Sequence, residues 1–195
     1  MATTTKEPIA IDPASPKLHL GGEEIQPYGT LRKLPLELPP AARRQSCELL
    51  NQVLADTVIL HNLYKKHHWL VAGPTFYQLH LLFDKHAGEQ LELIDALAER
   101  VQMLGGIAVS DPRHVAELTN IVRPPNGAEG VPAMLSRLME AHQIIIGETR
   151  KAIDVTDEIG DAGSNDLLMG EVLRTNEMQL WFTSSHLVDQ PLVGE

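Results

Sequence analysis

The chain has 195 residues, 43% of them hydrophobic and 22% charged, so it can bury one core and is too apolar to be wholly disordered. Acidic residues outnumber basic ones 26 to 16, a formal net charge of -10, which disfavours binding nucleic acid by phosphate neutralisation. No apolar run approaches the roughly 18 residues of a membrane span, and the N-terminus lacks the features of a signal peptide. With only one cysteine, the chain cannot form an internal disulfide, and we expect a cytoplasmic protein.

The N-terminal segment differs from the rest of the chain. Residues 1–40 contain seven of the thirteen prolines and keep neither a helical nor a strand period. We therefore predict an extended, proline-rich arm, which is nearly neutral rather than basic.

Apolar residues then recur at helical spacing in four segments, separated by glycine and proline signals. A long connection between the second and third segments holds three further prolines. The predicted elements are a helix at 41–71, a helix at 74–104, a connection at 107–130 with a short helix near 111–118, a helix at 131–159, a helix at 166–187, and a tail at 189–195.

The lengths of the connections indicate the fold class. They run short, long and short, and nothing reads as a strand. A long crossover between the second and third helices is typical of ferritin-like bundles, whereas three tight turns would favour a simple up-and-down bundle. We predict an all-α, ferritin-like four-helix bundle over residues 41–188.

The second predicted helix carries a stripe of metal-ligating residue types. His80, Asp84, Asp95 and Glu99 project within about 100° of one another on an ideal helix. His80 and Asp84 are neighbours one turn apart, as are Asp95 and Glu99. Asp84 and Asp95, however, lie roughly 16 Å apart along the axis, so one ion cannot contact both pairs in one chain.

Two subunits would solve this problem. If two copies of the helix pack antiparallel about a two-fold axis, His80 and Asp84 of one chain meet Glu99 and Asp95 of the other, which gives two identical sites per dimer. Gly88 lies beside that crossing and permits close approach. His68, at the end of the first helix, can reach the same site through the tight turn.

These residues resemble a known family. Between Lys66 and Gly106 the chain reads H-H-W, then H-x3-D, then D-x3-E followed by L-G-G. The pattern resembles the Dps family, twelve-subunit miniferritins that protect DNA during starvation and oxidative stress, and a coarser similarity spans about residues 41–187. The resemblance implies ligands His68, His80 and Asp84 from one subunit, ligands Asp95 and Glu99 from its two-fold mate, and Trp69 beside the site.

The resemblance also implies an activity. Such a protein is a ferroxidase that oxidises Fe(II) with hydrogen peroxide or oxygen and keeps ferric mineral inside a hollow homododecamer. Imidazole and carboxylate ligands suit iron, and zinc would bind as a competing ion. Asp161 and Asp166 fall where the family has a three-fold pore for incoming iron. We expect His67, which points about 100° away from His68, at the surface or behind the site.

Two departures from the family leave an alternative open. Leu81 follows the second ligand histidine where many members have an acidic residue, and the arm lacks the lysines of many DNA-binding members. The alternative is a structural protein that binds and compacts DNA in the nucleoid, but twelve copies would carry a charge of about -120, which opposes it. An ordinary ferritin with a di-iron site inside each subunit needs Glu-x-x-His motifs, and the sequence has none.

Overall fold

The computed structural model describes residues 16, 18 and 20–189. Within this part the chain is all helical and has no strand. None of its helices is both long enough and apolar enough to cross a membrane. The helices are α1 (Pro40–Leu70), α2 (Phe76–Met103), α3 (Pro112–Leu118), α4 (Val131–Glu158), α5 (Ala162–Leu167), the π-helical segment η1 (Leu168–Leu173) and α6 (Arg174–Ser184).

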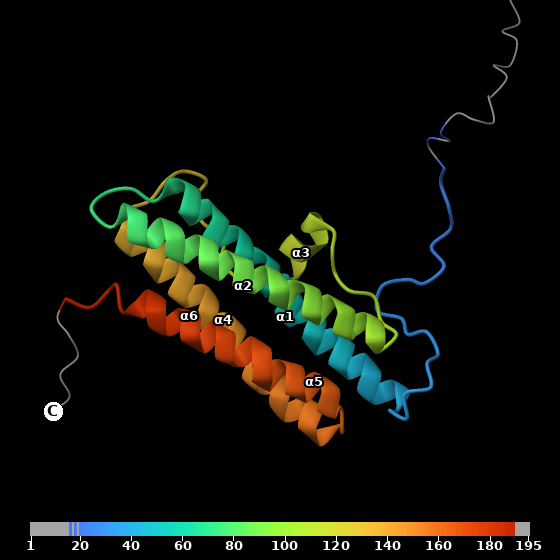
Figure 1. The fold of residues 1–195 in the computed structure, drawn as a ribbon. Helices are drawn as coiled ribbons and strands as arrows, with labels where there is room; N and C mark the ends of the chain where they lie inside the picture. The colour runs from blue at the N-terminus through green and yellow to red at the C-terminus, as the bar shows by residue number, and fades with distance from the viewer. Residues whose placement is uncertain (1–15, 17, 19, 190–195) are drawn as a thin grey trace, which may run out of the picture.

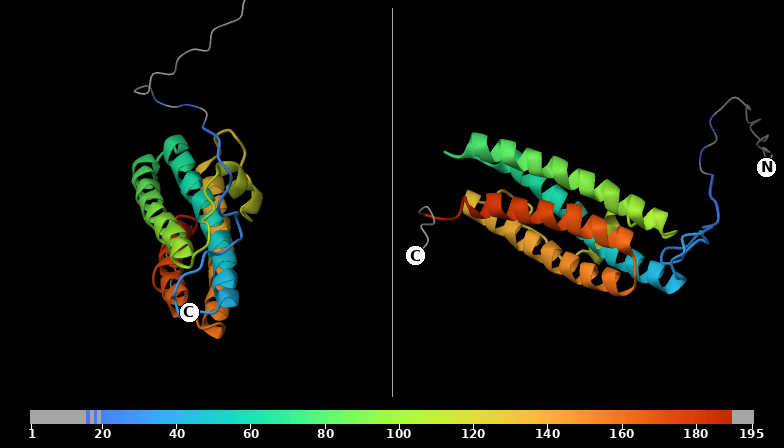
Figure 2. Two further views of the ribbon diagram at one scale, coloured as in Figure 1. Left: turned by 90° about the vertical axis from the view of Figure 1, so that its right-hand side faces the viewer. Right: turned by 60° about the horizontal axis from the view of Figure 1, so that its bottom comes forward.

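The long helices form a four-helix bundle, as predicted (Figures 1 and 2). α1 and α2 form one antiparallel pair, α4 and the continuous α5–η1–α6 rod form the other, and α1 packs on α4. Because the connection after α2 returns along the bundle and carries α3 on the outside of α1, α2 and α4 run in the same direction. That parallel pair is the topological consequence of a long crossover.

Local sequence explains where the helices begin and end. Proline occupies the first turn of α1, α3 and α4, where a missing N–H costs nothing. Asp111 caps α3 by accepting a hydrogen bond from the N–H of Arg113. The core contains apolar side chains from all four rods, each with at most 1% of its surface exposed: Leu50, Leu54, Leu60, Phe83, Leu97, Val101, Met134, Leu138, Ile145, Leu168 and Val172.

The last rod is not a plain α-helix. Its inward residues Ser164, Leu168, Val172 and Asn176 are all fully buried and recur every four residues. In an α-helix with 3.6 residues per turn, side chains four residues apart rotate progressively away from the core. The π-helical turn of η1 has more residues per turn and rotates them back. The single fourth helix predicted from residue 166 therefore begins earlier, at Ala162, and contains a π segment.

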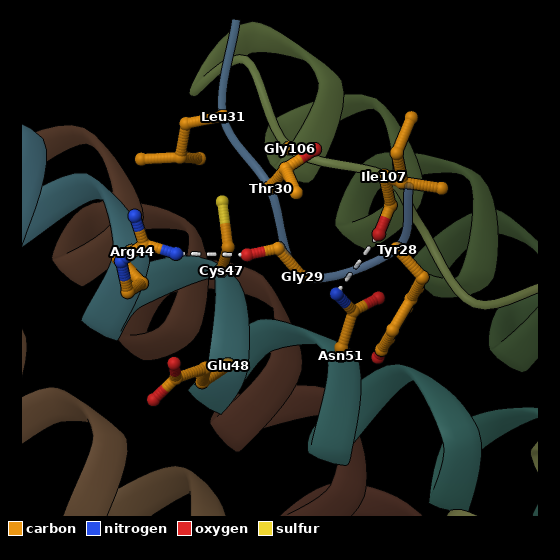
Figure 3. Close-up of a pocket in the computed structure, with 10 residues that line it drawn as sticks. All are labelled: Tyr28, Gly29, Thr30, Leu31, Arg44, Cys47, Glu48, Asn51, Gly106 and Ile107. Carbon is orange, nitrogen blue, oxygen red and sulfur yellow. Dashed lines mark hydrogen bonds between the residues drawn. The ribbon is translucent and has the colours of Figure 1, made fainter. Parts of the chain in front are cut away.

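Part of the described segment before α1, from Gln26 to Arg32, makes hydrogen bonds to the bundle, whereas the described residues before it are exposed. Residues 27–30 form a turn in which Gly29 has φ +78, and the Arg32 N–H donates to the carbonyl of Gly105. Arg44 donates to the carbonyl of Gly29, over a small pocket that Cys47 also lines (Figure 3). We call residues 26–32 the strap. Of the predicted arm, residues 1–15, 17 and 19 lie outside the described residues, as do residues 190–195 of the tail.

Candidate metal centre

The turn between α1 and α2 brings two predicted ligands into direct contact. His68 lies in the last turn of α1 and His80 in the second turn of α2. Nδ1 of each ring lies within hydrogen-bond distance of the other residue's backbone carbonyl, at 2.8 Å for His68 and 2.9 Å for His80. The rings stack with centroids 3.8 Å apart. The two reciprocal contacts hold the rings stacked on one another.

The hydrogen bonds also fix which ring nitrogens are free. A carbonyl oxygen can only accept a hydrogen bond, so Nδ1 of each histidine carries the proton. In a neutral imidazole Nε2 then keeps its lone pair, which is the tautomer that a metal ion requires. The two histidines therefore present two oriented Nε2 lone pairs that can bind a metal ion.

Asp84 lies one turn beyond His80 and supplies a carboxylate to the same place. Its Oδ1 is 3.9 Å from Nε2 of His68 and 2.6 Å from Nζ of Lys65. The hydrogen bond and charge of Lys65 hold the pKa of Asp84 below its usual value, so the carboxylate is ionised. The sequence interpretation missed Lys65, although it lies three residues before His68 and therefore on the same helix face.

The other predicted ligands do not reach this cluster within one chain. Asp95 and Glu99 are exposed on α2, about 16 Å further along the axis. Across the described ranges, no three His, Cys, Asp or Glu side chains are close enough to enclose a metal ion. Within the single chain, the predicted ligands thus form two separate half-sets.

Trp69 follows His68 and points outward, with 71% of its surface exposed. It lies at an open groove that Lys66, Arg123 and Pro124 also line. The structure therefore places Trp69 on the outer surface of the single chain, beside His68 in sequence.

The acidic residues assigned to a pore differ in their surroundings. Asp166 is exposed and lines a surface depression together with Asp157. Asp161 is only 2% exposed, pairs with Arg100 and accepts hydrogen bonds from the N–H and hydroxyl of Ser164. Although burial alone would raise the pKa of Asp161, these hydrogen bonds lower it. The prediction of Asp161 as a pore residue therefore does not fit, because its carboxylate caps α5 inside the subunit.

His67 is not at the surface, contrary to one of the two expectations. It is 1% exposed, packs beside Phe83, and neither ring nitrogen has a hydrogen-bond partner among the described residues. Burial lowers its pKa to about 4, so the ring is neutral. The position of His67 next to His68 on a helix predicted only the direction of its side chain. Whether that side chain is buried depends on how the neighbouring helices pack there.

Comparison with known proteins places the chain in a family. A family model described as a ferritin-like domain matches residues 47–193. The structure of DpsC from Streptomyces coelicolor is similar, with TM-score 0.86 and 63% identity over 88% of this chain and all of that one. An uncharacterized protein from Kitasatospora aureofaciens is 57% identical over 76% of this chain and 99% of its own length.

A curated relative carries the family's full name. The DNA protection during starvation protein of Agrobacterium fabrum is 30% identical over 79% of this chain and 94% of its own length. Together with the ferritin-like match and the four-helix bundle with its long crossover, these similarities show that the chain belongs to the Dps family of ferritin-like proteins.

Proposed function

We propose that this protein is a ferroxidase that oxidises Fe(II) with hydrogen peroxide or oxygen at sites shared between two subunits. The ferric product is stored inside a hollow homododecamer, and removing Fe(II) and oxidant protects DNA from oxidative damage. The observation that carries the proposal is the reciprocal His68–His80 pair, which leaves two Nε2 lone pairs beside the carboxylate of Asp84. Family membership supports iron storage and DNA protection as the setting.

The exposed face of α2 supports the second subunit. Tyr77, Leu81 and Leu91 expose half or more of their surfaces, and they share this face with Gly88 and Asp95 at steps of three, four and seven residues. In the antiparallel register that joins His80 to Glu99 and Asp84 to Asp95, Leu91 faces Gly88. A methyl group added to Gly88 would touch nothing within its own chain, so the space opposite Leu91 is open.

The same register gives a second large–small pair. Leu81 faces Ala98 of the two-fold mate, and Ala98 lies in a shallow depression lined by Leu91, Ile94 and Asp95. Large side chains opposite small ones are what close helix packing requires. The register that completes the ligand set therefore also pairs large side chains with small ones.

Each ligand has a role in handling Fe(II). The imidazole nitrogens and carboxylate oxygens form a mixed donor set that suits Fe(II) and Fe(III), and zinc would compete for the same donors. Lys65 holds the Asp84 carboxylate ionised, and a cation that binds Oδ1 must displace the Lys65 ammonium. Trp69, next in the chain to His68, would be covered by the assembly, where it shields the site from water.

Iron must also reach the interior of the shell. Asp166 and Asp157 are both exposed around one depression at the start of α5, and three copies at a three-fold axis would concentrate cations there. We propose these two residues for the pore, without Asp161.

A second function, compaction of DNA by a coat of protein, has one observation in its favour. The Agrobacterium relative is named for DNA protection, which coating could also provide. The net charge of -10 per chain opposes contact with phosphates. We expect no shift of plasmid mobility at 0.15 M salt without divalent cations, a salt level that screens charges beyond roughly 8 Å. A retarded plasmid under those conditions would favour compaction.

The ferroxidase proposal is tested with His80→Ala and Asp84→Ala. Each variant should lose rapid Fe(II) oxidation, followed as ferric absorbance after addition of peroxide or oxygen, because a ligand is missing. Each should keep the particle mass of a dodecamer by light scattering, since apolar contacts supply most assembly energy. His186→Ala, at an exposed histidine near the end of α6, is the matched control. Wild-type oxidation by either ligand variant would refute the site.

A further inference from the structure

A buried acidic side chain holds the crossover connection against α1. Asp56 is fully buried, and its Oδ1 accepts hydrogen bonds from the Thr119 hydroxyl at 2.6 Å and the Asn120 N–H at 2.7 Å. Its Oδ2 accepts from Gln52 Nε2 at 2.8 Å. Three donors therefore surround the Asp56 carboxylate, and two of them come from the connection.

A second acid from α4 approaches the same place. Glu148 Oε1 accepts a hydrogen bond from Asn120 Nδ2 at 2.6 Å. Its Oε2 is buried and has no donor among the described residues, while its side chain lies within hydrogen-bond reach of Asp56. Two ionised carboxylates facing one another with a buried oxygen lacking a donor would be strongly unfavourable.

We propose that Asp56 and Glu148 share one proton, which Glu148 Oε2 donates to the Asp56 carboxylate, and that this proton locks the crossover connection to the bundle. We call Asp56, Glu148 and their hydrogen bonds to residues 119 and 120 the clamp. Release of the shared proton leaves both carboxylates of the clamp negatively charged and loosens residues 119–121. The proposal concerns a site separate from the His68–His80 cluster and does not depend on ferroxidase activity.

The charges around the pair favour a protonated Glu148 near neutral pH. Burial, followed by the hydrogen bond and charge of Asp56, raises the pKa of Glu148 to about 7. The hydrogen bond from Asn120 on the connection and the charge of Lys151 on α4 lower this pKa, but each effect is smaller than burial and than the Asp56 hydrogen bond. Since the folded pKa lies above the ordinary 4.5, the clamp's stability is complete below about pH 4.5 and is lost as pH rises through 7.

Hydrogen–deuterium exchange of the Asn120 N–H tests the lock directly. We would compare the assembled wild type with Glu148→Gln, whose amide can donate to Asp56 at every pH, in buffers containing EDTA from pH 5.5 to 8.5. Comparing the two proteins at each pH cancels the intrinsic rate. We expect the wild-type rate, relative to the variant, to rise by up to roughly 30-fold over this range if opening restores an ordinary carboxyl pKa.

Controls keep the outcome decisive. Glu140→Gln, an exposed change on the same helix, should behave as wild type. Asp56→Asn should move the step to lower pH, because it removes a charge that raises the Glu148 pKa, and this test remains if Glu148→Gln misfolds. A rate ratio independent of pH would overturn the proposal. So would restored protection at pH 8.5 on adding Mn²⁺ in place of EDTA, since the pair would then be a cation site.

Discussion

Two histidines in the bundle centre are held neutral by the groups around them. Asn176 Nδ2 donates to the carbonyl of Val172, so its Oδ1 faces His142 and must accept from His142 Nδ1 at 2.9 Å. His142 Nε2 therefore accepts the Tyr64 hydroxyl at 2.6 Å, and the Tyr64 oxygen accepts from His86 Nδ1 at 3.1 Å. Each hydrogen bond sets the direction of the next, and none requires a charged ring.

This arrangement predicts an acid-sensitive stability. Burial lowers the pKa of His86 to about 4 and of His142 to about 3, against an ordinary 6.5. Below pH 6.5 the unfolded chain takes up protons that the folded chain refuses, so stability falls as pH drops from 6.5 towards the folded values. Between pH 7 and 5 each histidine contributes a loss of roughly 2 kcal/mol.

His142→Gln removes one of these titrations. We expect the variant to be less stable at pH 7, because the hydrogen-bond network is disturbed, but to lose less stability between pH 7 and pH 5 than the wild type. Urea unfolding at the two pH values measures the difference. His186→Gln, at an exposed position, should leave the pH slope unchanged, and an unchanged slope in His142→Gln would contradict the prediction.

Lys65 predicts how the candidate metal centre responds to charge. Its ammonium forms an ion pair with Asp84 and places a positive charge beside the ion that would bind there. Lys65→Met keeps most of the side chain's length and removes that charge, so Zn²⁺ binding should tighten by roughly 3- to 10-fold at low salt, and by less at high salt. Titration calorimetry with Zn²⁺ is the measurement, with Lys85→Met as a control on α2. Weaker binding in Lys65→Met would instead mean that Lys65 orients Asp84.

At the scale of elements, the strap depends on two glycines at the end of α2. Gly105 has φ +86, and a Cβ there would lie 2.8 Å from the carbonyl oxygen of Arg32. A Cβ on Gly106 would lie 2.7 Å from the Cys47 sulfur. Both contacts are too short for real atoms, so the L-G-G sequence permits the strap and α1 to approach.

Gly105→Ala should therefore release the strap. The left-handed backbone and the clash together cost about 1–3 kcal/mol, and trypsin should cut after Arg32 or Lys33 faster than in the wild type. Gly127→Ala, at an exposed loop position where a Cβ meets nothing within 4 Å, is the control. Equal cleavage rates in the two variants would show that the strap does not depend on Gly105.

The sequence predicted the helices well because each has a regular apolar period and clear stop signals. It also predicted that His68, His80 and Asp84 lie together, since a tight turn and helical spacing decide those positions. It could not predict the burial of Asp161 or His67, because burial depends on how α5 and α4 pack against α2 and α1. Nor did it predict η1, although four-residue steps from Ser164 to Asn176 were a readable signal.

At the scale of the whole molecule, the stripe on α2 determines what one subunit can do alone. Each chain carries His80 and Asp84 near the start of α2, beside His68 of α1, and Asp95 and Glu99 towards the other end, with an exposed apolar face between them. The proposed two-fold dimer would bring opposite ends together twice, so each site would take ligands from both chains. The two half-sets can therefore be mutated in separate chains.

Mixing two inactive variants tests this arrangement. One chain carries His80→Ala with Asp84→Ala, and the other Asp95→Ala with Glu99→Ala. Neither homo-oligomer has a complete site, so each should be inactive. In a mixed dimer the two-fold axis places all four mutations in one site and four intact ligands in the other. Random equal mixing makes half of the dimers mixed, so co-assembled shells should recover about a quarter of wild-type Fe(II) oxidation. A site within one subunit would recover none, because every chain would be defective, so inactive shells shown by mass to contain both chains would exclude the shared site.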